Sequence, residues 1–175
     1  MARTVMQVLD AAARQYGSRP AYKVNRDGRW QATSYGAFHE MVRQVARGLI
    51  ALGLEKGKGL AILGANRPEW FLADMGAIYA GGFPAGIYTT SAPEQCAYIT
   101  DHCEAPVAVL QNLEALDKFR QVRDRMPRLQ TIVLMEGTPP PATDPVGDVI
   151  TWNELLKRGD TVPDSVLDER IAAQD

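Results

Sequence analysis

The chain has 175 residues, of which 46% are hydrophobic and 23% are charged, a balance typical of a globular domain that can bury a core. Its 19 lysines and arginines against 21 acidic residues give a net charge of −2, which excludes a general attraction to nucleic acid or to an anionic membrane. No apolar run approaches the roughly 18 residues that cross a bilayer, and the N-terminus lacks a signal-peptide core, so we expect a cytoplasmic protein.

The first expected elements are a short helix and a β-hairpin. Thr4 and Gln7 stand at the N-cap and N3 positions of a capping box, and apolar residues then recur at helical spacing until Gly17. Residues 21–25 and 30–33 flank a short turn that contains a glycine. Two strand-like runs on either side of such a turn predict an antiparallel hairpin.

A longer helix follows the hairpin. Ser34 can cap its start, and Gly53 ends it. Its apolar residues follow the i, i+3, i+4, i+7 rule of a helix that packs one side onto a core: Phe38, Met41, Val42, Val45, Leu49 and Leu52.

From residue 60 onward, short apolar runs alternate with helical segments. The runs lack clean alternation, which is typical of parallel strands buried on both faces: 60–63, 83–87, 107–110 and 131–135. The segments between them predict helices at about 67–80, 92–103 and 113–126. This spacing predicts right-handed βαβ units, and therefore an α/β fold whose mostly parallel sheet is flanked by helices on both faces.

The last part of the chain is expected to contain a loop and two helices. Residues 137–147 are rich in proline, which predicts a loop inside the domain. Thr151 and Glu154 fit a capping box that opens a short helix ending near Arg158. Asp164 is the expected cap of a final helix.

Two helix starts share one sequence pattern, Asn66-Arg67-Pro68-Glu69 and Ser91-Ala92-Pro93-Glu94. In each we expect the first residue as N-cap, the proline in the first turn and the glutamate at N3. Such an N-cap satisfies a free backbone N–H and stabilises the helix by about 1 kcal/mol. The pattern is therefore explained by efficient strand-to-helix corners, without any function.

The position of the second corner adds a functional interpretation. Ligands of open parallel sheets bind beyond the carboxyl ends of the strands. Tyr88, Thr89 and Thr90 are expected there, where they could offer an aromatic face, hydroxyl groups and backbone amides to a polar ligand. The glutamate of the same corner disfavours an anion site, because it already occupies the positive end of the helix.

Motifs for other chemistries are missing from the sequence. It has neither a G-x-x-x-x-G-K-[ST] phosphate loop nor a G-x-G-x-x-G fingerprint. Cys96 and Cys103 are seven residues apart on one expected helix, too far for a disulfide and without zinc-like spacing, so we expect free thiols. His39 and His102 stand isolated, which favours structural or solvated roles. The sequence therefore nominates no catalytic residue and no metal ligand.

Five features stand in a fixed order along the chain: the turn ALGLEKG at 51–57, the strand end at 66–70, the Gly81-Gly82 pair, the segment GIYTT at 86–90 and the corner at 91–94. Their order and spacing resemble the N-terminal region of acyl-CoA synthetases in the adenylate-forming, AMP-binding superfamily. The resemblance is strongest to the long-chain fatty acid–CoA ligases and covers roughly residues 4–136.

The resemblance implies a reaction that uses ATP, Mg²⁺ and CoA. Such enzymes convert a fatty acid to an acyl-adenylate with release of diphosphate, and the thiol of CoA then displaces AMP. In the family, a phosphate loop with its lysine follows a position like that of Asp175. We therefore expect residues 1–175 to be the N-terminal part of the large AMP-binding domain, truncated before that loop and inactive without the remainder of the enzyme.

The resemblance also implies one candidate site, for CoA. In relatives, the loop that matches Tyr88, Thr89 and Thr90 borders the entrance for CoA, whose contacts are expected with the backbone more than with the side chains. Basic residues on the following helix could meet CoA phosphates or form a solvated face opposite its apolar side: Lys118, Arg120 and Arg123. Another group of apolar residues is expected to pack beside the sheet rather than to line an acyl tunnel: Trp70, Phe71, Met75, Ile78 and Tyr79.

Two other classes of function stay open at this point. The chain could be a stand-alone module that binds CoA or acyl-CoA without catalysis, or a dimerisation segment. A flavodoxin-like electron carrier is an alternative at the level of the fold alone. A homodimer and a peripheral membrane contact of the parent enzyme are further open expectations.

Overall fold

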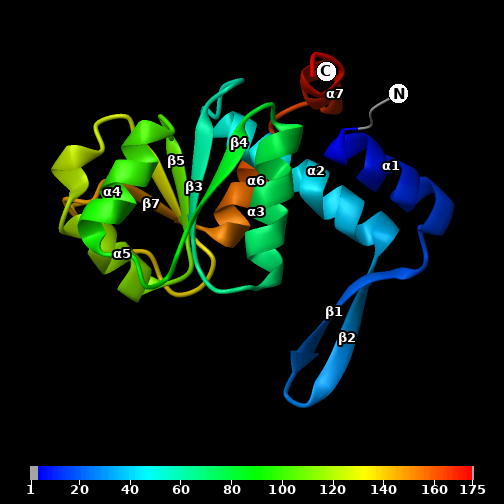
Figure 1. Ribbon diagram of the computed structural model, residues 1–175, viewed down its shortest axis with the longest axis horizontal. Helices are drawn as coiled ribbons and strands as arrows, with labels where there is room; N and C mark the ends of the chain where they lie inside the picture. Colours follow the sequence, from blue (N-terminus) through cyan, green and yellow to red (C-terminus); the bar gives the residue numbers. More distant parts are fainter. Residues whose placement is uncertain (1–3, 175) are drawn as a thin grey trace.

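The computed structural model describes residues 4–174. An N-terminal helix and hairpin precede a parallel sheet that helices cover on both faces (Figure 1). The elements are α1 (Val5–Tyr16), β1 (Pro20–Arg26), β2 (Arg29–Ser34), α2 (Tyr35–Ala51), β3 (Gly59–Leu63), α3 (Pro68–Tyr79), β4 (Phe83–Ile87), α4 (Pro93–His102), β5 (Val107–Leu110), α5 (Leu113–Arg120), the 3-10 helix η1 (Arg123–Arg125), β6 (Thr131–Leu134), β7 (Asp148–Thr151), α6 (Trp152–Gly159) and α7 (Asp164–Ala172).

The five strands of the main sheet follow the order β4-β3-β5-β6-β7, and every neighbouring pair is parallel. On the central strand β3, Ile62 pairs with Gly86 on one side and with Val109 on the other. Every residue of β3, β5 and β6 is buried, which explains why their sequences show apolar runs instead of alternation. The predicted parallel sheet is therefore confirmed.

Side chains of each strand alternate between two separate apolar cores. Leu60 and Ile62 of β3 belong to the core that α2, α3 and α6 cover. Ala61 and Leu63 belong to the opposite core, which α4 and α5 cover. Figure 1 shows these two groups of helices on the two sides of the sheet, as predicted for helices flanking both faces.

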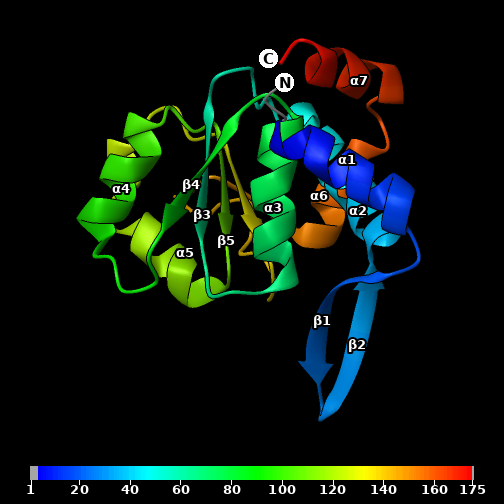
Figure 2. The ribbon, with the colours of Figure 1, turned by 45° about the vertical axis from the view of Figure 1, so that its right-hand side comes forward.

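The N-terminal hairpin extends away from the rest of the molecule (Figure 2). Its strands β1 and β2 pair antiparallel, as predicted, and their side chains are mostly exposed, with Trp30 68% accessible. Tyr22 fastens the hairpin to α2 by an edge-to-face contact with Phe38, at 5.6 Å between ring centroids. The capping box predicted at Thr4 and the N-cap predicted at Ser34 are also present.

Helix α3 begins one residue later than predicted. Its N-cap is Arg67, in extended backbone, and Pro68 occupies the first helical position. A residue directly before proline is disfavoured in the helical region, so the proline itself sets the boundary. Asn66 therefore lies outside the helix, and Glu69 is at N2 instead of N3.

Helix α4 shows the same shift. Ala92 is its N-cap and has no side-chain oxygen, so Ser91 does not cap the helix as predicted. Gln95, at N3, replaces the expected glutamate: its Oε1 accepts a hydrogen bond of 2.9 Å from the Ala92 N–H. Glu94 occupies N2, where its charge still favours the positive end of the helix.

For the second half of the chain, two predictions were wrong in detail and one strand was missed. Helix α5 ends at Arg120 instead of near residue 126, because the chain leaves the helical conformation at Val122 and continues as η1. Strand β7 was not predicted, since it comprises only four residues directly before α6. The N-cap of α7 is Pro163, so Asp164 is the first helical residue and not the cap. The loop at 137–147 and the start of α6 at Thr151 are confirmed.

Candidate functional site

The topology of the sheet defines one preferred place for a ligand. After β3 the chain enters α3, which packs on one face of the sheet, whereas after β5 it enters α5, which packs on the opposite face. Strands β3 and β5 are direct neighbours. The chain therefore leaves these two neighbouring strands toward opposite faces of the sheet, which defines a topological switch point. Open α/β sheets bind ligands at the carboxyl edge of such a point.

Two hollows lie at this carboxyl rim and share Gly64 and Thr89. The first is lined from the ends of β3 and β5 and from α5: Leu63, Gly64, Thr89, Gln111, Asn112, Glu114, Ala115 and Lys118. The second extends over the ends of β3 and β4: Gly64, Ala65, Asn66, Trp70, Gly86, Ile87, Tyr88 and Thr89. The segment predicted as a ligand edge therefore separates two depressions at the switch point.

The predicted segment forms a tight turn that presents its side chains outward. The Ser91 N–H donates a 2.9 Å hydrogen bond to the Tyr88 carbonyl, which places Thr89 and Thr90 at the corner. Tyr88 is 84% accessible, the highest value among the large apolar side chains of the described residues. Tyr88, Thr89 and Thr90 are thus brought together at the rim, as the sequence predicts.

Lys118 contacts this turn from α5. Its Nζ donates to the carbonyl oxygens of Thr89 at 2.6 Å and of Ser91 at 2.9 Å. The lysine is therefore neither part of a purely solvated face nor free for a phosphate without giving up these bonds. Its contact with the turn could not be read from the sequence, because 29 residues separate Lys118 from Thr89.

The other two basic residues nominated from the sequence serve the fold. Arg120 binds Asp144 of the proline-rich loop, with 2.7 Å between Nη2 and Oδ2, and this ion pair holds the pKa of Asp144 below its usual range. Arg123 donates to the backbone carbonyls of Val146, Met126 and Leu129 at 2.8, 2.7 and 2.6 Å. Neither guanidinium forms the predicted solvated face.

A polar brace crosses the rim beside the hollows. Arg67 donates from Nε to Glu69 and from Nη1 to Glu136, both at 2.7 Å. Gln111 donates to Glu136 at 3.3 Å and accepts from the Ala65 N–H at 2.8 Å. These residues follow β3, β5 and β6, so the brace fixes three strand ends relative to one another.

The brace also sets the charge at this end of the sheet. The guanidinium of Arg67 and the amide of Gln111 lower the pKa of Glu136, which keeps this carboxylate ionised and paired at neutral pH. A paired carboxylate repels an anionic ligand less than a free one. The brace therefore does not exclude a polar ligand from the turn, whose residues Tyr88, Thr89 and Thr90 are all exposed.

The two cysteines are free thiols, as expected. Both are buried, and burial raises the pKa of each thiol. A buried neutral thiol is a poor nucleophile and a poor metal ligand. Among residues 4–174, no cluster of three or more His, Cys, Asp or Glu residues could hold a metal ion.

Most of the apolar residues expected beside the sheet do pack there. Tyr79 is fully buried, and Trp70, Met75 and Ile78 pack partly buried against the core. Phe71 is different, because it is 49% accessible and contacts Trp70 edge-to-face at 6.0 Å between ring centroids. No helix in the described part of the chain is long and apolar enough to cross a membrane.

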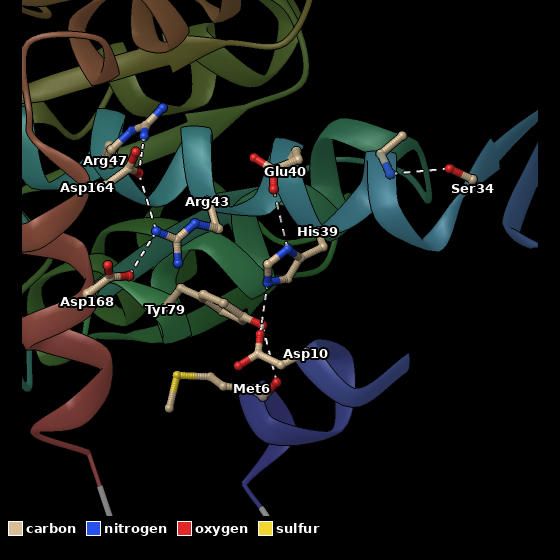
Figure 3. A network of polar contacts seen from close by, with 11 residues as sticks. Met6, Asp10, Ser34, His39, Glu40, Arg43, Arg47, Tyr79, Asp164 and Asp168 are labelled. Carbon is tan, nitrogen blue, oxygen red and sulfur yellow. Dashed lines mark hydrogen bonds and ion pairs between the residues drawn. The ribbon is translucent and has the colours of Figure 1, made fainter. Parts of the chain in front are cut away.

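A second polar cluster corrects the expectation that His39 stands isolated. His39 Nε2 lies 2.9 Å from Asp10 Oδ1, and the Tyr79 hydroxyl donates to the same oxygen at 2.7 Å (Figure 3). These three side chains join α2, α1 and α3. The cluster lies between helices on the face opposite α4 and α5, and its bonds are mutual, which indicates a structural role. His102 stacks on the exposed ring of Tyr98.

Comparison with known proteins decides which family has this arrangement. The family model described as AMP-binding enzyme matches residues 9–169. The chain belongs to the AMP-binding enzyme family. This result confirms the resemblance found in residues 4–136 and extends it through α6 and into α7.

The curated relatives of this AMP-binding chain include long-chain-fatty-acid–CoA ligases. It is 39% identical over 176 residues to the ligase ACSBG2 of Xenopus laevis, and 38% identical over 171 residues to ACSBG1 of Mus musculus. Each alignment covers 98% of this chain but 23% of the relative. The chain thus spans about a quarter of the length of these relatives.

Solved structures confirm the fold. The anthranilate CoA ligase AuaEII, solved in complex with anthranoyl-AMP, superimposes with a TM-score of 0.76 at 21% identity, over 89% of this chain and 28% of that one. A putative long-chain-fatty-acid CoA ligase from Rhodopseudomonas palustris gives a TM-score of 0.74 at 17% identity, over 87% and 36% of the two chains. The α/β architecture is therefore that of adenylate-forming enzymes.

Proposed function

We propose that this chain is the N-terminal part of the large AMP-binding domain of an ATP-dependent long-chain fatty acid–CoA ligase. The observation that carries the proposal is the alignment of 98% of the chain with relatives named as such ligases. The complete enzyme would join a fatty acid to AMP with release of diphosphate, and the CoA thiol would then displace AMP. An acyl phosphate anhydride is a better electrophile than a carboxylate, which is the chemical reason for the first step.

The proposal assigns to this chain the CoA-facing part of the site. Tyr88, Thr89 and Thr90 stand at the carboxyl rim, where open sheets of this kind bind their ligands. The exposed ring of Tyr88 fits a stacking or pantetheine contact, and the turn offers hydroxyl groups and backbone N–H groups. ATP and Mg²⁺ are assigned to the part of the relatives that this chain does not span.

The activity is tested with the protein encoded by the full reading frame, incubated with palmitate, ATP, Mg²⁺ and CoA. We expect palmitoyl-CoA and AMP to form only when all components are present. Palmitate-dependent exchange of diphosphate into ATP, measured without CoA, reports the first step separately. Absence of both the exchange and the thioester would contradict the proposal.

The CoA assignment is tested with Tyr88→Ala, matched to Tyr98→Ala on α4, another exposed tyrosine. We expect Tyr88→Ala to raise the KM for CoA several-fold, since an aromatic contact is worth about 1 kcal/mol, and to leave the exchange reaction unchanged. An unchanged KM for CoA would remove Tyr88 from the site.

The cytoplasmic location, a homodimer and a peripheral membrane contact complete the proposal for the whole enzyme. Sedimentation at several concentrations tests the dimer, and a strictly monomeric enzyme would exclude it. Cell fractionation tests the location, with activity expected in the soluble fraction or loosely bound to membranes.

A further inference from the structure

Lys118 donates hydrogen bonds to the Tyr88–Ser91 turn, and these bonds orient the backbone carbonyls that accept them. The Nζ group donates to two carbonyls of the turn, those of Thr89 and Ser91, at 2.6 and 2.9 Å. Bonds from an ammonium group to a carbonyl are stronger than those between neutral groups. Both carbonyls are therefore held toward α5.

The planarity of the peptide bond transmits this orientation to the next amide. In a trans peptide, the C=O of one residue and the N–H of the following residue point in opposite directions. Because the Thr89 carbonyl points to Lys118, the Thr90 N–H points away from it. Within residues 4–174 this N–H has no hydrogen-bond acceptor. It is an oriented donor at a solvent-exposed corner, directed away from α5.

The two amides that follow Thr90 do not share this property. The Ser91 N–H is used by the Tyr88 carbonyl, and the Ala92 N–H is used by Gln95 Oε1. Of these three amides, the Thr90 N–H is therefore the one that the lysine orients and that does not donate to another group of the turn. This arrangement does not depend on the threonine side chain.

We propose that Lys118 is a positioning residue that fixes the Thr89–Thr90 peptide so that the Thr90 N–H donates a hydrogen bond to CoA. The proposal rests on the function proposed above and names how that site is held. Without the lysine the two carbonyls lose their shared donor, and the Thr89–Thr90 peptide can rotate. The defect then falls on the step that uses CoA and not on the formation of the acyl-adenylate.

The test uses Lys118→Met in the full-length protein, with Lys157→Met as the matched control. Lys157 is an exposed lysine of α6 whose side chain forms no hydrogen bond or ion pair among the described residues. We expect Lys118→Met to raise the KM for CoA roughly tenfold, the value of one charge-assisted hydrogen bond, and to leave the KM for ATP and the exchange reaction at wild-type values. A KM for CoA within twofold of wild type would overturn the proposal.

The exchange reaction also reports whether the variant folds, because it requires an intact site but no CoA. If Lys118→Met lacks exchange, Lys118→Gln replaces it, and the same limit on the KM for CoA applies. If the wild-type protein shows no palmitate-dependent exchange, the proposed function itself is wrong. If the wild type is active but substitution of Lys118 leaves the KM for CoA unchanged, only the positioning role is wrong.

Positioning is separated from direct phosphate binding by CoA that lacks its 3′-phosphate. If Lys118 acts through the turn, Lys118→Met raises the KM by the same factor for CoA and for the dephosphorylated form. An increase that disappears with the dephosphorylated form would assign Lys118 to the phosphate and overturn the proposal.

Discussion

The hydroxyl of Tyr79 donates a hydrogen bond of 2.7 Å to Asp10 Oδ1 and thereby joins α3 to α1 across 69 positions of the sequence. The ring of Tyr79 is fully buried, and its hydroxyl also lies 3.2 Å from the Met6 carbonyl. His39 binds the same Asp10 oxygen from α2. This shared carboxylate is the main polar connection that holds the N-terminal helix against the rest of the molecule (Figure 3).

Replacing Tyr79 with phenylalanine is expected to destabilise the chain. The change removes the hydroxyl from two acceptors but keeps the ring, so we expect the free energy of unfolding to fall by about 1–2 kcal/mol in urea titrations. Tyr22→Phe is the control, because the Tyr22 hydroxyl has no hydrogen bond among the described residues. Equal stabilities of the two variants would contradict the role given to the Asp10 contact.

The same hydroxyl predicts a pH dependence. Burial and the hydrogen bond to Asp10 raise the pKa of Tyr79 well above its usual value. Above a pH of about 10 an unfolded tyrosine loses its proton whereas the folded one keeps it, so stability falls as the pH rises further. Between pH 9 and 11, the free energy of unfolding of Tyr79→Phe should therefore fall less than that of the wild type. Parallel losses would show that this hydroxyl does not titrate as the structure implies.

Arg123 is expected to be essential for the stability of the segment after α5. Its guanidinium binds three backbone carbonyls, so Arg123→Ala leaves three acceptors without their charged donor. We expect a loss of at least about 2 kcal/mol in the free energy of unfolding. Arg125→Ala, two residues further on and exposed, is the matched control and should change stability by less than about 0.5 kcal/mol. A similar effect of both substitutions would exclude a special role for Arg123.

Helix α7 is expected to depend on charge for its attachment to α2. Arg43 binds Asp168 at 2.9 Å and Asp164 at 3.3 Å, and Arg47 also binds Asp164. The pair with Arg43 lowers the pKa of Asp164, so its stabilising effect is complete above the unfolded pKa of about 3.9 and is lost as the pH falls below it.

The attachment of α7 is measured by amide hydrogen exchange, corrected for intrinsic rates. Asp164→Asn should accelerate exchange within residues 164–172 at pH 7, and the difference from wild type should shrink near pH 3. Glu169→Gln is the control, since Glu169 is exposed and forms no ion pair among the described residues. Unchanged exchange in Asp164→Asn at pH 7 would show that the ion pairs of Asp164 do not hold the helix.

The sheet and its helices could be predicted because their signals are local. The strands β3, β5 and β6 are buried on both faces, and runs such as Val107–Leu110 are apolar throughout as a result. The ends of elements were harder. The caps at Asn66 and Ser91 were misplaced by one residue because the restriction that proline imposes on its predecessor outweighed the preference for a polar cap.

The candidate site could be predicted only in part, for a similar reason. The place of Tyr88, Thr89 and Thr90 follows from the order of strands and helices. Three contacts each join residues far apart in the sequence: the bond from Lys118 to the Thr89 carbonyl, the bond from Arg123 to the Val146 carbonyl, and the bond between His39 and Asp10. In such contacts the partner is set by packing, and a single sequence carries no periodic signal for it.

The decisive test of the CoA site is hydrogen exchange of the full-length protein with and without CoA, because it reports where CoA meets the backbone. We expect saturating CoA to slow exchange of the amides in residues 88–91, including Thr90, and to leave the hairpin formed by β1 and β2 unaffected. Protection confined to other segments, with residues 88–91 exchanging as in the free protein, would contradict the proposed site.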